Sequence, residues 1–293
     1  YHNDEVTLPD SERAEMRKRR NVNRDRLKKG LRRDDKPSPI GCRSQGSYAM
    51  RTMVQQGDKD YDIDDGVYFN KEKLKGPQGG DKSANDAKEM VRQALHDESF
   101  NRAPEKLKNC VRVYYQEGYH VDVPVYRELN EKIVWGAQET WYELASTECK
   151  RSDPLAVTNW LLDENRRQSP GKDNGGQLRR IVRFLKAFAR SRRSWRAKMA
   201  TGFMITKLVV EEYHVNSARE DRSLYDTMVG IRDRLMTDLE IDHPTVDGAM
   251  LTKGPNDPRT RFLREKLDWA IGELKVLFEP GCTRKKALEA WDI

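Results

Sequence analysis

The fold of this protein is decided by the stretch Asp62-Ile-Asp-Asp-Gly-Val-Tyr68, in which acidic and apolar residues alternate. Residues 61–69 as a whole alternate in the way that is typical of a β-strand. Side chains two positions apart on a strand point to the same side, so Asp62 and Asp64 would present parallel carboxylates while Asp65 points the other way. The sequence therefore predicts a strand that carries a charged site on one face.

A third carboxylate, Asp122, lies further along the chain and alternates with valines. It belongs to the second of two strand-like runs, 110–115 and 119–125, which predict a hairpin. If this hairpin pairs beside the first strand, the three carboxylates converge and would repel one another unless a cation lay among them. Hard Mg²⁺ prefers such oxygen ligands, and two such ions can activate an attacking hydroxyl and stabilise a leaving pyrophosphate. We therefore predict that Asp62, Asp64 and Asp122 are catalytic residues that hold two Mg²⁺ ions, with Mn²⁺ as the alternative.

The turn at Gly46 and Ser47 supplies a complementary phosphate site. Glycine permits a close approach of the backbone, and the amides at the start of a following helix, together with the Ser47 hydroxyl, can hold a phosphate. We expect that helix over residues 48–56. Tyr48 and Tyr68 flank the proposed site, where each could stack on a base or serve the core.

Charge is distributed unevenly along the 293 residues, whose formal net charge is +7. Residues 11–36 hold twelve Lys or Arg and five Asp or Glu, and residues 179–198 hold nine Lys or Arg and no acid. The remainder is acidic, which suits an anionic ligand or a nucleic-acid surface, while two solvated helix faces are the alternative. Six Trp, eleven Tyr and seven Phe supply enough bulk for a core, which argues against wholesale disorder.

Membrane, disulfide and zinc proteins are excluded by simple counts. The longest apolar stretch, residues 203–210, is interrupted by Lys207, whereas a membrane span needs about 20 residues. Nothing at the start of the sequence resembles a signal peptide. No CxxC pair occurs among the four dispersed cysteines, so we expect reduced thiols and a cytoplasmic protein. These are Cys42, Cys110, Cys149 and Cys282.

The pattern changes from mixed α and β to helices after Asp153-Pro154. A long polar helix is expected to begin near Leu8, capped by Asp10 or Ser11, with sparse apolar positions. These positions are Met16, Val22 and Leu27. Further helices are expected over 84–95, 178–188, 203–213, 224–239 and 261–278.

Three segments together resemble the core of the DNA-polymerase-β-type nucleotidyltransferases. They are Gln45-Gly-Ser-Tyr-Ala-Met50, Asp62-Ile-Asp-Asp-Gly-Val-Tyr68 and His120-Val-Asp-Val-Pro124. Within that superfamily they most resemble the bacterial cGAS/DncV-like nucleotidyltransferases (CD-NTases) of CBASS anti-phage signalling. Residues 179–188 are similar to the helix that opens the oligoadenylate-synthase-like C-terminal domain of that family, and the resemblance runs from about residue 8 to about residue 280.

The resemblance implies an α+β, two-lobed nucleotidyltransferase fold. A mixed-sheet catalytic lobe would be joined to a helical, oligoadenylate-synthase-like C-terminal lobe, with the active site in the cleft between them. Residues 1–36 would form a basic helix bridging the lobes, residues 37–153 the catalytic core and residues 154–293 the helical domain.

The implied activity is a Mg²⁺-dependent condensation of NTPs, ATP and/or GTP, into a cyclic di- or trinucleotide messenger with release of pyrophosphate. Asp62, Asp64 and Asp122 would form the metal triad, with Asp122 nearest the attacking hydroxyl. The nucleotide-binding residues that the resemblance implies are Gln45, Gly46, Ser47, Tyr48, Lys186 and Thr201. Among these, Gln45 and Ser47 would contact the donor triphosphate, Lys186 matches a phosphate-contacting lysine, and Thr201 lies where the family often has a serine.

The resemblance also implies partners. Accessory proteins of a ubiquitin-like conjugation system are expected, the protein would be a monomer, and no membrane is involved. The sequence has no zinc ribbon of the kind that binds duplex DNA in the animal sensor, so activation by DNA is not expected.

Two other functions stay open. One keeps the fold but makes a template-independent polymerase of linear oligonucleotides, and the other is a non-catalytic nucleic-acid-binding module whose basic stretches form the binding surface. Three clustered acids count against the binding module. His120 lies on the same side of its strand as Asp122, where it could line the site or be structural.

Overall fold

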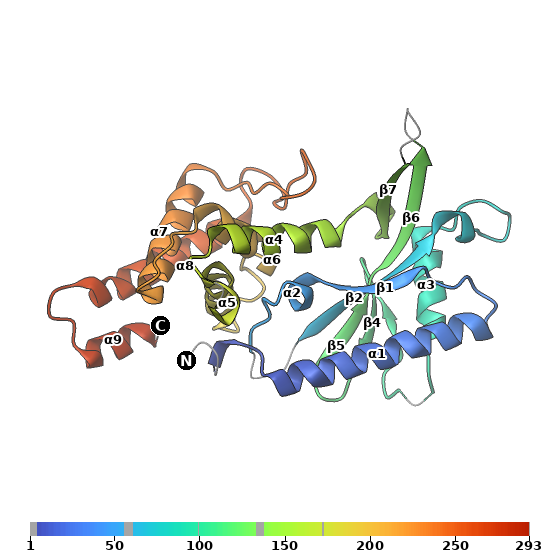
Figure 1. The fold of residues 1–293 in the computed structure, drawn as a ribbon, viewed down its shortest axis with the longest axis horizontal. Coiled ribbons are helices and arrows are strands. Elements are labelled where there is room, and N and C mark those ends of the chain that lie inside the picture. The colour runs from blue at the N-terminus through green and yellow to red at the C-terminus, as the bar shows by residue number, and fades with distance from the viewer. Residues whose placement is uncertain (1–4, 56–60, 99, 133–137, 172, 293) are drawn as a thin grey trace. The chain divides into compact units, whose positions relative to one another are not determined.

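The computed structural model describes residues 5–55, 61–98, 100–132, 138–171 and 173–292. The chain divides into two compact units, one of residues 8–158 and the other of residues 1–7 and 159–293. The first contains a mixed β-sheet with helices and the second is helical, so the predicted α+β class is confirmed (Figure 1). Within the described part of the chain, no helix has the length and apolar character needed to cross a bilayer.

The sheet is built around β2. Its strands are β1 (Gly41–Gln45), β2 (Asp62–Asn70), β3 (Glu105–Lys106), β4 (Val111–Tyr114), β5 (His120–Val123), β6 (Val125–Lys132), β7 (Gln138–Ala145) and β8 (Cys149–Arg151). β1 pairs with β2 in the antiparallel sense, whereas β5 and β6 follow each other along β2 in one parallel register. Pro124, which has no N–H to donate, separates β5 from β6, and its carbonyl accepts a hydrogen bond from the Val67 amide at 2.9 Å. β4 continues the sheet beside β5, and β7 continues it beside β6.

Two helices cover one face of this sheet, α1 (Asp10–Arg33) and α3 (Ala84–Leu95) (Figure 1). Leu27 and Leu31 of α1 share one apolar cluster with Val67 and Phe69 of β2. The two helices cross closely at Gly30, where a Cβ would lie 1.9 Å from the carbonyl oxygen of Ala94. Because side chains alternate along a strand, Asp62 and Asp64 of β2 and Asp122 of β5 lie on the opposite face.

Several local predictions were wrong. α1 begins after Pro9 without a side-chain cap from Asp10 or Ser11. The helix expected over 48–56 is the single turn α2 (Gly46–Ala49). Beyond it the chain turns at Arg51, whose φ of 56° is left-handed and ends a regular helix.

The second unit contains all four of the helices that the sequence predicts after residue 154. They are α5 (Gln177–Arg190), α6 (Gly202–Glu212), α7 (Glu220–Thr237) and α8 (Pro258–Leu274). Two further helices had no predicted range, namely α4 (Pro154–Gln168), which begins in the first unit and continues into the second, and α9 (Arg284–Trp291). Short 3₁₀ turns also occur at Lys71–Lys73, Asp173–Gly175 and Lys275–Phe278. Leu178, Ile181, Val182 and Leu185 form a buried apolar stripe along α5.

Candidate active site

Four polar side chains form a two-by-two arrangement on the face of the sheet that α1 and α3 leave open. In the parallel register of β2 and β5, Asp62 lies opposite His120 and Asp64 lies opposite Asp122. We call these four residues the β2–β5 grid. The predicted pairing of the hairpin beside the first strand is therefore confirmed. One donor atom from each of Asp62, His120 and Asp122 lies within 4.8 Å of the others, a donor set that fits a divalent cation.

The carboxylate of Asp64 lies against the turn at Gly46. A Cβ on Gly46 would come within 2.1 Å of Asp64 Oδ2, and Gly46 has a φ of +62°. Gln45 is the residue opposite Asp64 in the β1–β2 ladder, which holds the turn beside this carboxylate. Glycine is thus required here both by its backbone conformation and by the close approach of an acid.

Arg112 is a site residue that sequence reasoning missed. It lies on β4 directly opposite Asp122, and its guanidinium donates two hydrogen bonds of 2.7 Å, one to each oxygen of that carboxylate. These bonds raise the pKa of the Arg112 guanidinium. A hairpin that places Asp122 on one face also places its cross-strand neighbour on that face, but the register between the two strands decides which residue that neighbour is.

The predicted nucleotide-binding residues near the grid already have protein contacts. The buried Gln45 donates from Nε2 to the Tyr126 hydroxyl at 2.9 Å, and the Tyr126 ring stacks on Tyr68 at 4.7 Å. Tyr68 is 1% exposed, which agrees with a place in the core, the second of the two roles that the sequence left open for it. Ser47 is half-buried in the α2 turn.

Tyr48, the other aromatic candidate, lies beside α1. Arg13 and Arg20 each place a guanidinium 5.9 Å from the centre of its ring, and Arg17 Nε donates to its hydroxyl at 3.4 Å. The ring is half-buried.

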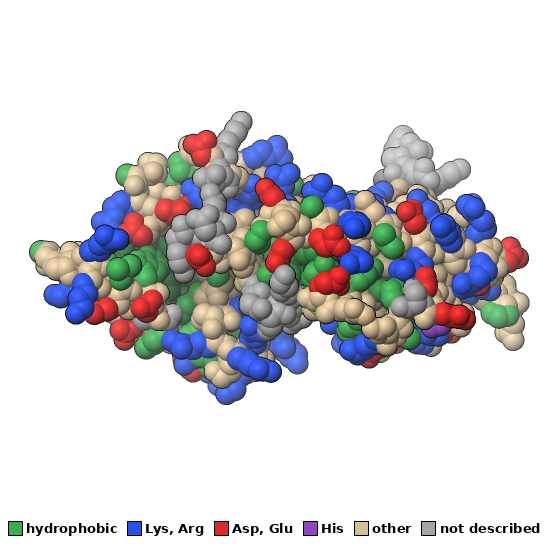
Figure 2. Space-filling model, turned by 90° about the horizontal axis from the view of Figure 1, so that it is seen from below, with side chains coloured by type: hydrophobic (Ala, Val, Ile, Leu, Met, Phe, Trp, Pro, Cys, Tyr) green, Lys and Arg blue, Asp and Glu red, His purple; other side chains and the backbone are tan. Residues whose placement is uncertain are grey.

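Asp65 lies on the face of the sheet that is opposite the grid, as predicted, and it connects β2 to α1 through hydrogen bonds. Arg24 of α1 donates to both of its oxygens, and Ser44 donates to one of them at 3.2 Å. Other α1 arginines are paired too, Arg19 with Glu117 and Arg26 with Asp97. On the face that Figure 2 shows, Lys and Arg side chains are interspersed with Asp and Glu. Several basic residues of α1 are thus held in ion pairs within the first unit.

The two predicted residues of the helical unit lie close to each other. Lys186 on α5 is 5% exposed, and its Cε lies 3.0 Å from the position that a Cβ on Gly202 would take. Thr201 caps α6, because its hydroxyl accepts a hydrogen bond from the Met204 amide at 3.2 Å. The ammonium group is thus near the N-terminal end of α6, where backbone amides favour an anion. The alternative of a solvated helix lysine was wrong for Lys186.

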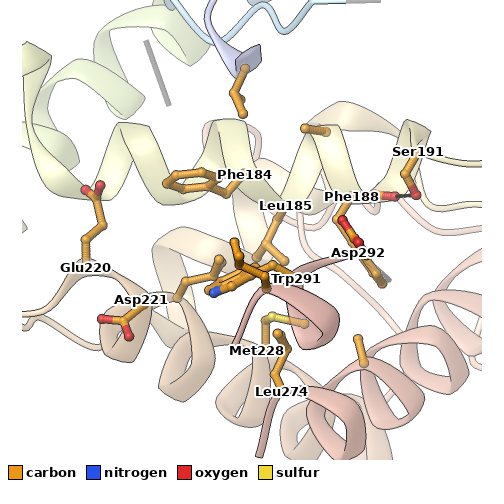
Figure 3. A pocket seen from close by; sticks show the side chains of 15 residues that line it. Phe184, Leu185, Phe188, Ser191, Glu220, Asp221, Met228, Leu274, Trp291 and Asp292 are labelled. Carbon is orange, nitrogen blue, oxygen red and sulfur yellow. Dashed lines mark hydrogen bonds between the residues drawn. The ribbon is translucent and has the colours of Figure 1, made fainter. Parts of the chain in front are cut away.

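A separate cavity of about 560 Å³ lies within the helical unit and is mainly apolar. Phe184 and Phe188 of α5 line it from one side and Trp291 of α9 from another (Figure 3). Its charged lining residues are acids, namely Glu220, Asp221 and Asp292. A triphosphate needs cations, so this cavity does not have the chemistry of the nucleotide site.

Comparison with known proteins agrees with this geometry. Residues 41–126 match the family model described as the nucleotidyltransferase domain of the DncV-like cyclic GMP-AMP synthases. This segment contains the α2 turn and the whole β2–β5 grid.

Solved structures extend the similarity to nearly the whole chain. Escherichia coli DncV with bound 3′-deoxy GTP is 18% identical, with a TM-score of 0.71, over 98% of this chain and 91% of that chain. Vibrio cholerae DncV with the linear intermediate 5′ pppA(3′,5′)pG is 18% identical, with a TM-score of 0.74, over 99% and 92%. Vibrio cholerae DncV with nonhydrolyzable GTP is 16% identical, with a TM-score of 0.75, over 98% and 90%. Residues 41–126 therefore match a nucleotidyltransferase domain of the DncV-like family, and nearly the whole chain has a fold similar to that of two-lobed DncV.

Proposed function

We propose that this protein condenses ATP and GTP into a cyclic dinucleotide and releases pyrophosphate at each new bond. The observation that carries the proposal is the β2–β5 grid beside the Gly46 turn, because it joins a set of cation ligands to a phosphate-binding turn. The similar Vibrio cholerae and Escherichia coli enzymes support the choice of substrates, since they were solved with ATP, GTP, GTP analogues and a linear A–G intermediate.

In the proposed reaction a ribose hydroxyl of one nucleotide attacks the α-phosphorus of the other. The bond from that phosphorus to the bridging oxygen breaks, pyrophosphate leaves, and a second round closes the ring. Asp62, Asp64 and Asp122 would hold divalent cations, Mg²⁺ or Mn²⁺, which would lower the pKa of the hydroxyl and neutralise the triphosphate. Asp122 would lie nearest the hydroxyl.

Backbone and side-chain donors would orient the donor triphosphate. The amides after Gly46 and the Ser47 hydroxyl bind phosphate oxygens, while Gln45 fixes the turn from the side. In the helical unit, Lys186 and the N-terminal amides of α6 after Thr201 add positive charge for the phosphates. These contacts position the reactants, which is the main requirement of a reaction whose chemistry the cations assist.

The test is incubation with all four NTPs and a divalent cation, followed by phosphatase and mass spectrometry. We expect a phosphatase-resistant species with the mass of a cyclic dinucleotide containing A and G. An Asp62→Asn, Asp64→Asn double variant serves as the control and should be folded and inactive. A ladder of linear products would instead identify a template-independent polymerase, and a folded double variant with full activity would contradict the role of the carboxylates.

The resemblance extends the proposal to the cell. We propose that the cyclic product serves CBASS anti-phage defence, that the protein acts in the cytoplasm as a monomer, and that accessory ubiquitin-like conjugation proteins are its partners. Phage challenge of bacteria that carry the wild-type or the double-variant gene within its operon tests this role. Equal protection by both genes would contradict it.

A further inference from the structure

One of the four residues of the β2–β5 grid, His120, is not a carboxylate. His120 lies directly opposite Asp62 and two residues from Asp122 on the same strand face, and it is 7% exposed. Its imidazole contributes a donor atom within 4.8 Å of donor atoms of both acids. Two donors on opposite sides of one ion, each bound at about 2.1 Å, are about 4.2 Å apart, so these three atoms are spaced almost as ligands of a single ion.

We propose that His120 is a direct ligand of the cation held by Asp62 and Asp122, and that its imidazole makes this site select Mn²⁺ over Mg²⁺. The role of the cation in catalysis depends on the proposed function, but cation binding by these residues does not. The two ideas can therefore fail separately.

The selectivity follows from the chemistry of the donors. Mg²⁺ is a hard ion that prefers oxygen ligands in near-ideal octahedral geometry, whereas transition-metal ions accept imidazole nitrogen readily. A set of two carboxylates and one imidazole therefore favours Mn²⁺ more than three carboxylates would.

Arg112 leaves room for this coordination and orients the ligand. It donates one hydrogen bond to each Asp122 oxygen, and an ionised carboxylate has about four acceptor positions in total. One oxygen of Asp122 can thus bind a cation while Arg112 holds the group in a fixed rotamer. The competing explanation is that His120 serves the fold, for example through its contact with Tyr114, whose ring centre lies 6.3 Å from its own.

Electron paramagnetic resonance of the full chain with Mn²⁺ and no nucleotide tests the proposal directly. We expect bound Mn²⁺ to show ¹⁴N modulation from one imidazole in the electron spin echo, and we expect Mg²⁺ to displace it only in large excess. Bound Mn²⁺ without ¹⁴N modulation would overturn the proposal, and this readout needs no variant.

Variants then connect the signal to the residue. His120→Gln should lose the ¹⁴N modulation, bind Mn²⁺ at least about tenfold more weakly and lower the Mn²⁺/Mg²⁺ preference by a similar factor, because an oxygen replaces the nitrogen. His96→Gln is the matched control, since His96 is exposed at the end of α3 and belongs to no cation-binding group found among the described residues. Unchanged Mn²⁺ affinity in a folded His120→Gln protein would overturn the proposal.

Product analysis of the same samples separates the two hypotheses. A ¹⁴N signal lost in His120→Gln, with no cyclic product in the wild type, would support the ligand and contradict the proposed function. Cyclic product from a wild-type protein whose bound Mn²⁺ shows no ¹⁴N modulation would support the proposed function and contradict His120 as a ligand.

Discussion

Arg112 and Asp122 lie directly opposite each other on β4 and β5 and share two hydrogen bonds of 2.7 Å. The aspartate side chain is 8% exposed and that of the arginine is 25% exposed. Burial of an ionised carboxylate without a partner raises the free energy of the folded state. The Arg112 guanidinium therefore stabilises Asp122, which the neighbouring Asp62 and Asp64 would otherwise repel. The site thus contains its own counter-charge on the strand next to the acids.

Replacement of Arg112 should therefore destabilise the protein in a way that a divalent cation corrects. We expect Arg112→Met to lower the free energy of unfolding by about 1–3 kcal/mol without metal. We also expect Mn²⁺ to raise its Tm more than that of the wild type, because the ion takes over the missing charge. Calorimetry with and without Mn²⁺ measures both effects. Arg102→Met, at an exposed ion pair, is the control, and metal-free stability equal to that of the wild type would contradict the expectation.

A methyl group on Gly46 should slow catalysis strongly and have a smaller effect on the fold. The added Cβ would displace the Asp64 carboxylate, which lies 2.1 Å from its position. A displacement of about 1 Å in a catalytic group costs about 100-fold in rate, whereas the left-handed backbone adds only about 1–2 kcal/mol of strain. Kinetic assays and thermal unfolding of Gly46→Ala check this. Gly80→Ala, where nothing lies within 4 Å, should behave as the wild type, and an active Gly46→Ala enzyme would remove the turn from the site.

The sequence predicted those parts of the site that depend on local periodicity. The alternation in residues 61–69 and in the 110–125 hairpin was sufficient to place Asp62, Asp64 and Asp122 on one face and Asp65 on the other. The position of Arg112 depends on the register between β4 and β5, which no periodicity within one strand specifies.

Other features escaped prediction because tertiary contacts decide them. β6 has several charged residues and a weak alternation, yet it forms because its backbone continues the β5 ladder along β2. The burial of Lys186 could not be inferred from its helix, whose 179–198 region carries cations on several sides. The sequence predicted the three acids of the grid, but it left open whether His120 lines the site or has a structural role.

Acid should weaken the ion pairs of Glu89, one with Arg92 within α3 and one with Lys106 of β3. Hydrogen bonds from Arg92, together with Lys106 of β3, lower the pKa of Glu89 to about 2 from its ordinary 4.5. A depressed carboxyl pKa gives stability that is present above the ordinary value and is lost as the pH falls from about 4.5 toward 2. We expect Glu89→Gln to remove on the order of 2 kcal/mol at pH 7 and to flatten the stability curve between pH 4.5 and 2. Denaturant unfolding across that range measures it, with the exposed Glu98→Gln as control, and parallel curves for wild type and Glu89→Gln would contradict it.

Lys186 should contribute to nucleotide affinity. Its buried ammonium lies beside Gly202 at the start of α6, so replacing the lysine would remove a phosphate partner in the complex. For Lys186→Met we expect the Kd of a nonhydrolysable GTP analogue to rise about tenfold or more, which is about 1.4 kcal/mol. Calorimetric titration measures the affinity, and the exposed Lys198→Met provides the control for loss of a positive charge. Equal weakening by both substitutions would mean that general electrostatic attraction is responsible, and unchanged affinity in Lys186→Met would remove Lys186 from the nucleotide site.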